Sequence, residues 1–337
     1  MGAKTPDYVN KSSTVVFGDV RDRQLLKKLI KDVDAIVHLA AMVGVGQSMY
    51  DIERYIDVNT RGTATVLDLV VNEKNRVKKL VVASSMSIYG EGKYYCEKCC
   101  VNVYPGLRSE KALKRQQWDQ SCPNCNSLLI PKPTDEEKPL MPTSIYAMAK
   151  RHQEEMVLLL GKTYGIPTVA LRYFNIYGSR QALSNPYTGC AAIFTSRILN
   201  DKAPYIFEDG NQTRDFIHVK DVAKANLSVL EHNTADYQAI NIGTGKPLPI
   251  KNLAETFTKL YEKPNLQPHI SNEYRKGDIR HCYADTTKAQ KLLNFKPTIS
   301  LEEGLTELAE WAKTHDWGAI DLFEKALNEL RERHLAT

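Results

Sequence analysis

Tyr146 and Lys150 stand four positions apart, and this spacing places both side chains on one face of a helix. A lysine ammonium beside a tyrosine hydroxyl favours the phenolate, so it lowers the tyrosine pKa from about 10 toward working pH. A phenol with such a pKa can take a proton from a substrate hydroxyl and return it. The pair is therefore a candidate for catalytic proton transfer.

The Tyr-x-x-x-Lys pattern alone is weak, because a chain with 17 tyrosines matches it about once by chance. Tyr94 and Lys98 are a second match, but they lie in a cysteine-rich stretch without helical periodicity, so we reject them. Serines strengthen the first match, because the segment VVASSMSIYG is a predicted strand that runs into Ser84, Ser85 and Ser87. A serine at the carboxyl end of a parallel strand can hydrogen-bond the same substrate oxygen as the tyrosine.

Short β-branched runs alternate with helix-period segments along most of the chain, a pattern typical of a parallel sheet with helices on both faces. The predicted strands are residues 13–17, 34–40, 78–85, 167–178 and 237–243, and the main predicted helices are residues 62–74 and 146–165. From about Asn185 onward the pattern becomes irregular, and it ends in an amphipathic helical tail over 301–334. The predicted fold class is α/β, a Rossmann-like doubly wound parallel sheet with a smaller C-terminal cap over the carboxyl ends of the strands.

Two Cys-x-x-Cys pairs are separated by 22 residues, the spacing of a four-thiolate zinc ribbon; they are Cys96/Cys99 and Cys122/Cys125. Cys100 could replace Cys99 as a ligand, and the alternative interpretation is four free thiols in a loop. A zinc ion held by four thiolates has no open coordination position. The predicted zinc is therefore structural.

The segment around these cysteines, residues 94–142, is rich in Cys, Pro and charge and is interpreted as an insertion. It lies between Ser85 and Tyr146 in the sequence, so we expect it to hang over the mouth of the substrate pocket. Zinc ribbons also occur in nucleic-acid-binding proteins. No basic and aromatic face accompanies this one, so no nucleic-acid partner is expected.

The overall composition is that of a soluble globular protein, with 42% apolar and 25% charged residues among 337. The net charge is mild at +5, because 45 Lys and Arg face 40 Asp and Glu. No apolar stretch approaches about 18 residues, and the N-terminus lacks the apolar region of a secretion signal, so no membrane partner is expected. Seven cysteines without such a signal indicate a reducing compartment, and we predict a cytoplasmic location.

Motifs along nearly the whole chain resemble those of the extended short-chain dehydrogenase/reductases, specifically the nucleotide-sugar epimerase/dehydratase family. The matching segments are DVRD at 19–22, HLAA at 38–41, DVNTRGT at 57–63, SSMSIYG at 84–90, the Tyr146/Lys150 pair, LRYFNIYG at 171–178, RDFIHVKDVAKAN at 214–226 and YRKGDIRHCYAD at 274–285. The resemblance implies NAD as cofactor and a nucleotide sugar as substrate. With the cysteine-rich segment and VGVGQSMYDI, the chain is most similar to the dTDP-L-rhamnose 4-epimerase type.

The resemblance also implies a role for individual residues. It makes Ser85 and Tyr146 the catalytic pair and places Lys150 on the nicotinamide ribose. For the rest of the cofactor it implies Asp19 and Val20 at the adenine, and Ala40, Ala41 and Asn59 along the groove. For the nucleotide sugar it implies Ser87, Asn175, Arg214, Arg275 and Asp278, with Tyr205 and Phe207 near the base. Two arginines suit bidentate binding of phosphate groups.

The residues that follow Ser85 narrow the chemistry. Family members that dehydrate the sugar have Thr-Asp-Glu where this chain has Ser85-Met86-Ser87, and sugar-acid decarboxylases have Glu at the Ser87 position. Without an acid there, elimination and decarboxylation lose the group that handles their proton. The resemblance therefore implies NAD-dependent epimerisation at C4 of a nucleotide-activated deoxysugar, dTDP-linked, through a 4-keto intermediate. Two alternatives stay open: an NAD(P)H-dependent 4-keto-sugar reductase, and a non-catalytic sugar-nucleotide-binding homologue.

The glycine-rich turn of the family, G-x-x-G-x-x-G, is the part of the pattern that does not match. The resemblance places it ahead of Ser13, but Gly2 is the only glycine before Gly18. That turn brings the NAD pyrophosphate to a helix N-terminus. We therefore expect an N-terminally truncated enzyme, in which the strand at residues 13–17 has no partner and the next strand has an open edge.

The expected domain organisation follows from the same resemblance. An incomplete NAD-binding domain spans residues 1–180 and contains the zinc-ribbon-like insertion at 94–142. A mainly substrate-binding domain spans 181–337, and residues 214–245 return from it to the sheet. By analogy with the family, we expect a homodimer formed through the helix that carries Tyr146.

Overall fold

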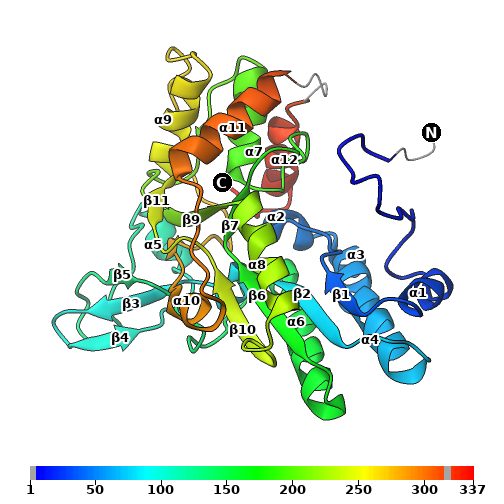
Figure 1. Cartoon of the computed structure of the whole chain (residues 1–337). Helices are drawn as coiled ribbons and strands as arrows, with labels where there is room; N and C mark the ends of the chain where they lie inside the picture. The colour runs from blue at the N-terminus through cyan, green and yellow to red at the C-terminus, as the bar shows by residue number, and fades with distance from the viewer. Residues whose placement is uncertain (1–4, 315–319) are drawn as a thin grey trace.

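A four-stranded parallel sheet forms the centre of the molecule in the computed structural model, which describes residues 5–314 and 320–337 (Figure 1). Its strands lie in the order β1-β2-β6-β10, with the bounds Ala35–His38, Lys79–Ser85, Thr168–Tyr173 and Gln238–Ile242. Each neighbouring pair runs parallel. The predicted α/β class with a parallel sheet is therefore confirmed.

Helices cover both faces of this sheet; they are α1 (Arg23–Ile30), α4 (Gly62–Asn72), α6 (Ile145–Tyr164), α8 (Val219–Glu231) and α10 (Thr287–Leu293). Successive side chains of a strand point to opposite faces. In β2, Val81 therefore packs with residues of α8 and α10, whereas Leu80 packs with residues of α4 and α6. All of β2 is buried, which explains its continuous apolar run. None of the described helices is long and apolar enough to cross a lipid bilayer.

The long helix α6 has clear end signals. The Ser144 hydroxyl accepts a hydrogen bond from the Ala147 amide at 3.1 Å and caps the first turn. Gly165 ends the helix at φ +68°, a left-handed conformation that favours glycine. Short segments precede it in the chain: α2 (Val45–Ser48), α3 (Ile52–Tyr55), a π-helical turn (Ile56–Arg61) and a 3-10 turn (Met86–Tyr89).

The C-terminal cap lies over the carboxyl ends of the central strands, and its helices gather in the upper part of Figure 1. Its helices are α7 (Cys190–Leu199), α9 (Ile250–Leu260), α11 (Leu301–Thr314) and α12 (Phe323–Glu332). Its strands are β7 (Asn175–Tyr177), β8 (Tyr205–Ile206), β9 (Thr213–His218), β11 (Pro247–Pro249), β12 (His269–Ile270) and β13 (His281–Cys282). β9 pairs with β7, β11 and β13, while α8 and β10 return to the central sheet. The domain boundary at residue 180 stays a prediction.

The cysteine-rich insertion forms a small antiparallel sheet of its own at the left of Figure 1. Its strands lie in the order β4-β3-β5, with the bounds Val101–Val103, Lys93–Cys96 and Ile130–Lys132. The short helix α5 (Glu110–Lys114) lies between β4 and β5 in sequence. A separate apolar cluster holds this unit together, centred on Tyr94 and the cysteines.

Residues 13–17 do not form the predicted strand. Val15, Val16 and Phe17 are exposed, Phe17 by 53%. Figure 1 shows this deep-blue segment running away from the sheet. A strand is stable when its backbone groups pair with a neighbour, and no described strand pairs with these residues or with the outer edge of β1. The truncation from which an open edge was expected here stays a prediction.

Candidate active site

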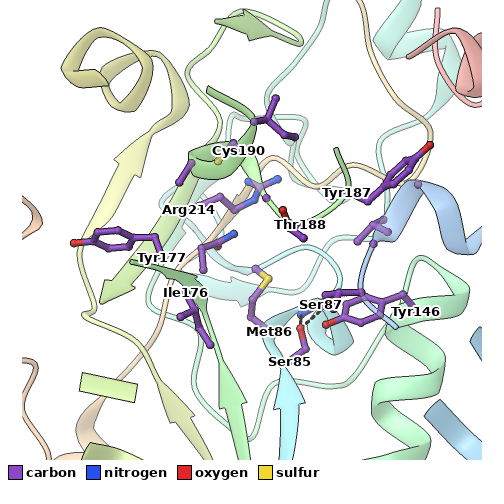
Figure 2. A pocket seen from close by; sticks show the side chains of 18 of the residues that line it. Ser85, Met86, Ser87, Tyr146, Ile176, Tyr177, Tyr187, Thr188, Cys190 and Arg214 are labelled. Atoms are coloured by element: carbon purple, nitrogen blue, oxygen red, sulfur yellow. Dashed lines mark hydrogen bonds between the residues drawn. The ribbon is translucent and has the colours of Figure 1, made fainter. Parts of the chain in front are cut away.

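A cavity of about 940 Å³ lies at the carboxyl ends of the central strands, beneath the cap (Figure 2). β2 contributes Ser85 to its wall, and α6 contributes Tyr146 and Lys150. The cap contributes residues of β7, β8 and β9. Elements far apart in the sequence therefore meet where open α/β sheets bind ligands.

Ser85 is held by the turn that follows its strand. Its hydroxyl accepts a hydrogen bond from the Ser87 amide at 3.2 Å and shares a hydrogen bond with the Ser87 hydroxyl. Figure 2 shows both serines pointing toward Tyr146, with Arg214 across the cavity. A substrate oxygen placed between Ser85 and Tyr146 can therefore contact both hydroxyls.

Tyr146 and Lys150 are buried in the first turns of α6. The Tyr146 amide donates to the Ser48 hydroxyl at 3.0 Å, which ties the start of α6 to α2. Tyr55 packs edge-on against the Tyr146 ring, with centroids 6.5 Å apart. The Lys150 ammonium donates to the Ala83 carbonyl at 2.8 Å, which leaves its other protons for a ligand.

The expected effect of Lys150 on its neighbour is not observed. Burial raises the pKa of Tyr146, although the hydroxyls of Ser85 and Ser87 act in the opposite direction. Burial also lowers the pKa of Lys150 to about 7, so at neutral pH this side chain carries only part of a charge. The prediction of a lowered tyrosine pKa was wrong because burial disfavours the charged phenolate.

Replacing Lys150 with Met is expected to flatten the dependence of stability on pH. Burial lowers the lysine pKa from 10.5 to about 7, so between these values the unfolded chain binds a proton that the folded chain does not. Above pH 10.5 the lysine is neutral in both states and the shift does not affect the free energy of unfolding. As pH falls from 10.5 toward 7, the shift lowers this free energy by about 1.4 kcal/mol per pH unit. Urea denaturation of wild type and variant between pH 7 and 10 measures this slope.

The matched control is Lys162→Met, because Lys162 is an exposed lysine of the same helix. Its stability should follow the wild-type pH profile. Equal slopes for all three proteins would show that Lys150 is charged in the folded state across this range.

A buried ion pair behind the site was missed by the sequence analysis. The Arg172 guanidinium donates to the Glu154 carboxylate at 2.6 Å, and both side chains are nearly inaccessible. The Ser84 hydroxyl donates to the same carboxylate at 2.5 Å. Arg172 also donates to the Tyr89 hydroxyl, which donates to Asn241 at 2.7 Å. The signal in the sequence was a charge within the apolar strand TVALRY.

The predicted substrate residues all lie on the cavity wall: Ser87, Asn175, Tyr205, Phe207, Arg214, Arg275 and Asp278. Arg275 donates to the Asp278 carboxylate at 2.8 Å and stacks on the Phe207 ring at 4.5 Å. Arg214 donates to the Ile279 carbonyl at 2.7 Å. The loop around Tyr187, residues 178–189, also lines the cavity, although no motif in the sequence predicted this.

Asn175 carries a feature that favours a ligand. Its side-chain oxygen is buried and has no hydrogen-bond partner in the structure. A buried polar atom without a partner is costly, so native proteins rarely leave one unsatisfied. A donor group on a bound molecule would satisfy it.

The predicted cofactor residues are divided between two places. Ala41 lines the cavity together with the Tyr146/Lys150 pair, whereas Ala40 is exposed outside it. Asn59 is fully buried and hydrogen-bonds both backbone groups of Met42, so it shapes the end of β1. The rest of the set, Asp19 and Val20, lies beyond the cavity wall.

Asp19 and Val20 have protein partners of their own. The Arg21 guanidinium hydrogen-bonds the Asp19 carboxylate at 2.7 Å and lowers its pKa to about 2. Val20 packs against α4, close to Gly62. The adenine role predicted for this pair stays a prediction.

The described residues fit one end of NAD. The buried ammonium of Lys150, the serines at the end of β2 and the small Ala41 suit a nicotinamide riboside inside the cavity. No glycine-rich turn for the pyrophosphate occurs among residues 5–314 and 320–337. The N-terminus of α1 cannot serve instead, because the Asp22 carboxylate already accepts from the Leu25 amide there and would repel a phosphate.

The four predicted metal ligands come together in the insertion. The Sγ atoms of Cys96, Cys99, Cys122 and Cys125 all lie within 4.8 Å of one another. Tetrahedral zinc with bonds of about 2.3 Å separates its sulfurs by nearly 4 Å, so this group fits the ion. The neighbouring thiols of Cys125 and Cys96 raise the pKa of Cys99 to about 12, an effect that a bound cation would oppose. Cys100 is exposed and donates to the Glu97 carbonyl, so it lies outside the group.

The insertion does not hang over the mouth of the cavity. None of the described residues that line the cavity belongs to 94–142. Gly90 and Thr143, which flank the insertion, do line it. The small sheet packs beside β13, where the Gly92 amide donates to the His281 carbonyl at 2.9 Å. This expectation was wrong because backbone hydrogen bonds from Gly92 to His281 and from Thr134 to Tyr283 hold both ends of the small sheet beside β13.

Comparison with known proteins identifies relatives with the same architecture. The model of the NAD-dependent epimerase/dehydratase family matches residues 3–105 and 123–243. The dTDP-L-rhamnose 4-epimerase of Burkholderia thailandensis is 33% identical over 311 residues, which cover 92% of this chain and 84% of the relative.

Two solved structures have a similar fold. The UDP-glucose 4-epimerase of Thermotoga maritima, solved with UDP-glucose, has a TM-score of 0.73 and 27% identity, covering 90% of this chain and 86% of the other. The UDP-glucuronic acid 4-epimerase of Bacillus cereus, solved with UDP-glucuronic acid and NAD, has a TM-score of 0.67 and 28% identity, covering 88% and 80%.

Proposed function

The chain belongs to the NAD-dependent epimerase/dehydratase family, and we propose that it epimerises C4 of a dTDP-linked deoxysugar. The observation that carries this proposal is the convergence of Ser85, Tyr146 and Lys150 at one end of a cavity lined by the predicted nucleotide-sugar residues. The relative from Burkholderia thailandensis supports the choice of dTDP and of a 4-epimerase.

Proton transfer at the sugar O4 is the step assigned to the protein. Tyr146 takes the O4 proton as C4 is oxidised and returns it when C4 is reduced. Ser85 hydrogen-bonds the same oxygen and keeps it facing the phenol. Lys150 would bind the ribose hydroxyls of the cofactor with the protons that its bond to the Ala83 carbonyl leaves free. Bound NAD would supply the hydride acceptor and donor that oxidation and reduction at C4 require.

Inversion requires the 4-keto sugar to turn over while its nucleotide stays bound. Arg214 and Arg275 face the cavity and are suited to the diphosphate, which would anchor the molecule during this turn. The cavity of about 940 Å³ leaves room for a sugar in two orientations.

The carboxylates on the cavity wall are poorly suited to dehydration or decarboxylation. Among the described lining residues, Glu208 and Asp278 carry the only carboxylates, and each is paired with an arginine. At the end of β2, where a proton-handling acid would be needed, the chain has Ser85 and Ser87. Epimerisation needs no further acid, so the site suits it better.

The test is to incubate the purified protein with dTDP-L-rhamnose, UDP-glucose and UDP-glucuronic acid, with NAD⁺ and without a reductant. A C4 epimer of the dTDP-sugar, detected by NMR, is the expected product. A dTDP-4-keto sugar consumed only with NAD(P)H would instead establish the reductase. Binding without turnover would establish the non-catalytic homologue.

We also propose that the Cys96/Cys99/Cys122/Cys125 group holds one Zn²⁺ with a structural role. Mass spectrometry of the purified protein is expected to show one zinc per chain. The Cys122→Ser variant is expected to lose most of this zinc. Cys100→Ser is the matched control, because Cys100 is adjacent but outside the group. A metal-free wild type, or loss of zinc in both variants, would refute the assignment.

A homodimer in the cytoplasm remains our proposal. Met148 and Leu159 are exposed and apolar, and they lie on one face of α6 because eleven residues make close to three helical turns, so this face suits a helix interface. Sedimentation velocity should give twice the chain mass. Replacing Leu159 with Lys should yield the monomer.

A further inference from the structure

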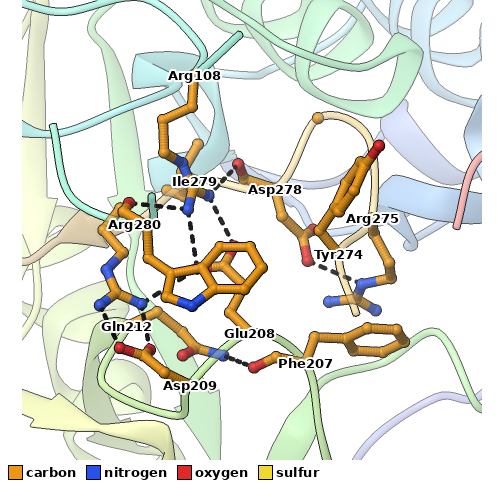
Figure 3. Close-up of polar contacts among 12 residues, drawn as sticks. Arg108, Phe207, Glu208, Asp209, Gln212, Tyr274, Arg275, Asp278, Ile279 and Arg280 are labelled. Carbon is orange, nitrogen blue, oxygen red and sulfur yellow. Dashed lines mark hydrogen bonds and ion pairs between the residues drawn. The ribbon is translucent and has the colours of Figure 1, made fainter. Parts of the chain in front are cut away.

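Arg108 connects the cysteine-rich insertion to the cap (Figure 3). Its guanidinium makes two parallel hydrogen bonds of 2.8 Å to the Glu208 carboxylate. It also donates to the carbonyls of Asp278 and Trp118, each at 3.0 Å. The side chains of Arg108 and Glu208 are both only 3% exposed. A bidentate pair with this little solvent fixes the two segments relative to each other.

A second arginine completes the connection. Arg280 donates to Glu208 at 3.1 Å and to Asp209 at 2.6 Å. It also donates to Asp119 of the insertion at 2.8 Å. Leu113 and Trp118 of the insertion pack against Tyr274 at the start of the same cap loop. The insertion therefore contacts the loop over residues 274–280 through polar and apolar groups.

The cap residues at this contact are neighbours of the predicted nucleotide-sugar residues. Glu208 lines the cavity and follows Phe207, whose ring lies under Arg275. Glu208 has a φ of +58°, a strained conformation that its partners must maintain. Its amide donates to the Glu273 carbonyl at 2.7 Å, which joins the 207–209 turn to the 274–280 loop.

The contact segment, residues 100–121, is tethered by the cysteines. Arg108 and Asp119 lie between Cys99 and Cys122 in the sequence, so a metal bound by the four thiolates would close the segment at both ends. Closing a loop restricts its conformations and lowers the entropy that it loses on docking. A loaded site would therefore hold Arg108 ready to bind Glu208.

We propose that this contact segment is a positioning element for nucleotide-sugar binding, and that Arg108 is its positioning residue. Through Glu208 and the Asp278 carbonyl, Arg108 holds the turn of Phe207 and the loop of Arg275 in their binding arrangement. This proposal rests on the proposed function for the identity of the ligand. The coupling itself concerns only residues of this chain.

Arg108→Met is a suitable variant because it does not leave a buried charge alone. Glu208 keeps its ion pair with Arg280, and methionine retains the apolar part of the side chain. Arg115→Met is the matched control, because Arg115 is an exposed arginine of the same segment. Both variants are compared with wild type in the zinc-loaded full chain.

The first measurement compares the effects of the substitutions on KM and on kcat. Arg108→Met is expected to raise KM for the nucleotide sugar about tenfold, with kcat within twofold of wild type. Arg115→Met should change neither value. Zinc removal from wild type should raise KM similarly, and removal from Arg108→Met should add little, because both changes release the same loop.

The second measurement is hydrogen exchange without substrate, which does not depend on activity. Arg108→Met and zinc removal should each increase exchange at residues 207–212 and 273–280, but not in α6. Unchanged exchange there, or increased exchange with an unchanged KM, would overturn the proposal. A wild type that turns over no nucleotide sugar would refute the proposed function, whereas the exchange result would still decide whether the segment positions the loop.

Discussion

Tyr146→Phe is expected to lower kcat by about a thousandfold, because it removes the group that takes and returns the O4 proton. The phenol is buried between Ser85 and Tyr55, so phenylalanine fits the same space. Binding of the nucleotide sugar depends on other residues and should change little. Steady-state kinetics gives kcat, and calorimetric titration with dTDP gives the affinity.

The matched control for this prediction is Tyr55→Phe. Tyr55 is a buried tyrosine that packs against Tyr146, and its hydroxyl donates to Gln47 at 3.0 Å, outside the cavity wall. Loss of this hydroxyl should leave kcat within threefold of wild type. If Tyr146→Phe also retained a kcat within tenfold, another group would be transferring the proton.

Glu154→Ala is expected to lower the free energy of unfolding by about 3–5 kcal/mol. The substitution removes the counter-ion of Arg172 in the core and leaves the Ser84 hydroxyl without its acceptor. An uncompensated buried charge is among the few single changes with so large an effect. Urea denaturation followed by circular dichroism measures the change.

Two further variants test the cause of this loss. Glu155→Ala changes the adjacent glutamate, which pairs with Arg151 at the surface, and should cost less than about 1 kcal/mol. Adding Arg172→Met to Glu154→Ala should restore part of the lost stability, because the unpaired charge disappears. Equal losses in Glu154→Ala and Glu155→Ala would contradict a special role for the buried pair.

The buried pair also links stability to the catalytic residues. Glu154 lies one helical turn beyond Lys150 on α6, and Ser84 precedes Ser85 at the end of β2. Glu154 thus joins α6, which carries the lysine, to β6 through Arg172 and to β2, which carries the serine, through Ser84. A partial loss of activity in Glu154→Ala would therefore be a consequence of displaced side chains, and it should be smaller than in Tyr146→Phe.

Features that depend on a few neighbouring residues could be predicted from the amino-acid sequence. The β-branched runs and helix periods predicted the parallel sheet, since side-chain direction repeats within each element. The Tyr146/Lys150 spacing predicted a shared helix face, and the two Cys-x-x-Cys pairs predicted a group that the structure assembles. Motif resemblance predicted catalytic and nucleotide-sugar residues that line one cavity, whereas most of the predicted cofactor residues lie outside it.

Features that depend on partners distant in the chain could not be predicted from local patterns and became apparent in the folded structure. Residues 13–17 have a strand-like composition, but a strand forms only where another strand pairs with it. The pKa of Tyr146 rises because several elements together exclude water, which no local pattern encodes. Arg172 and Arg108 look like ordinary surface charges in the sequence. In the folded chain packing excludes solvent from both side chains, and each guanidinium pairs with a carboxylate far away in sequence, Glu154 and Glu208 respectively.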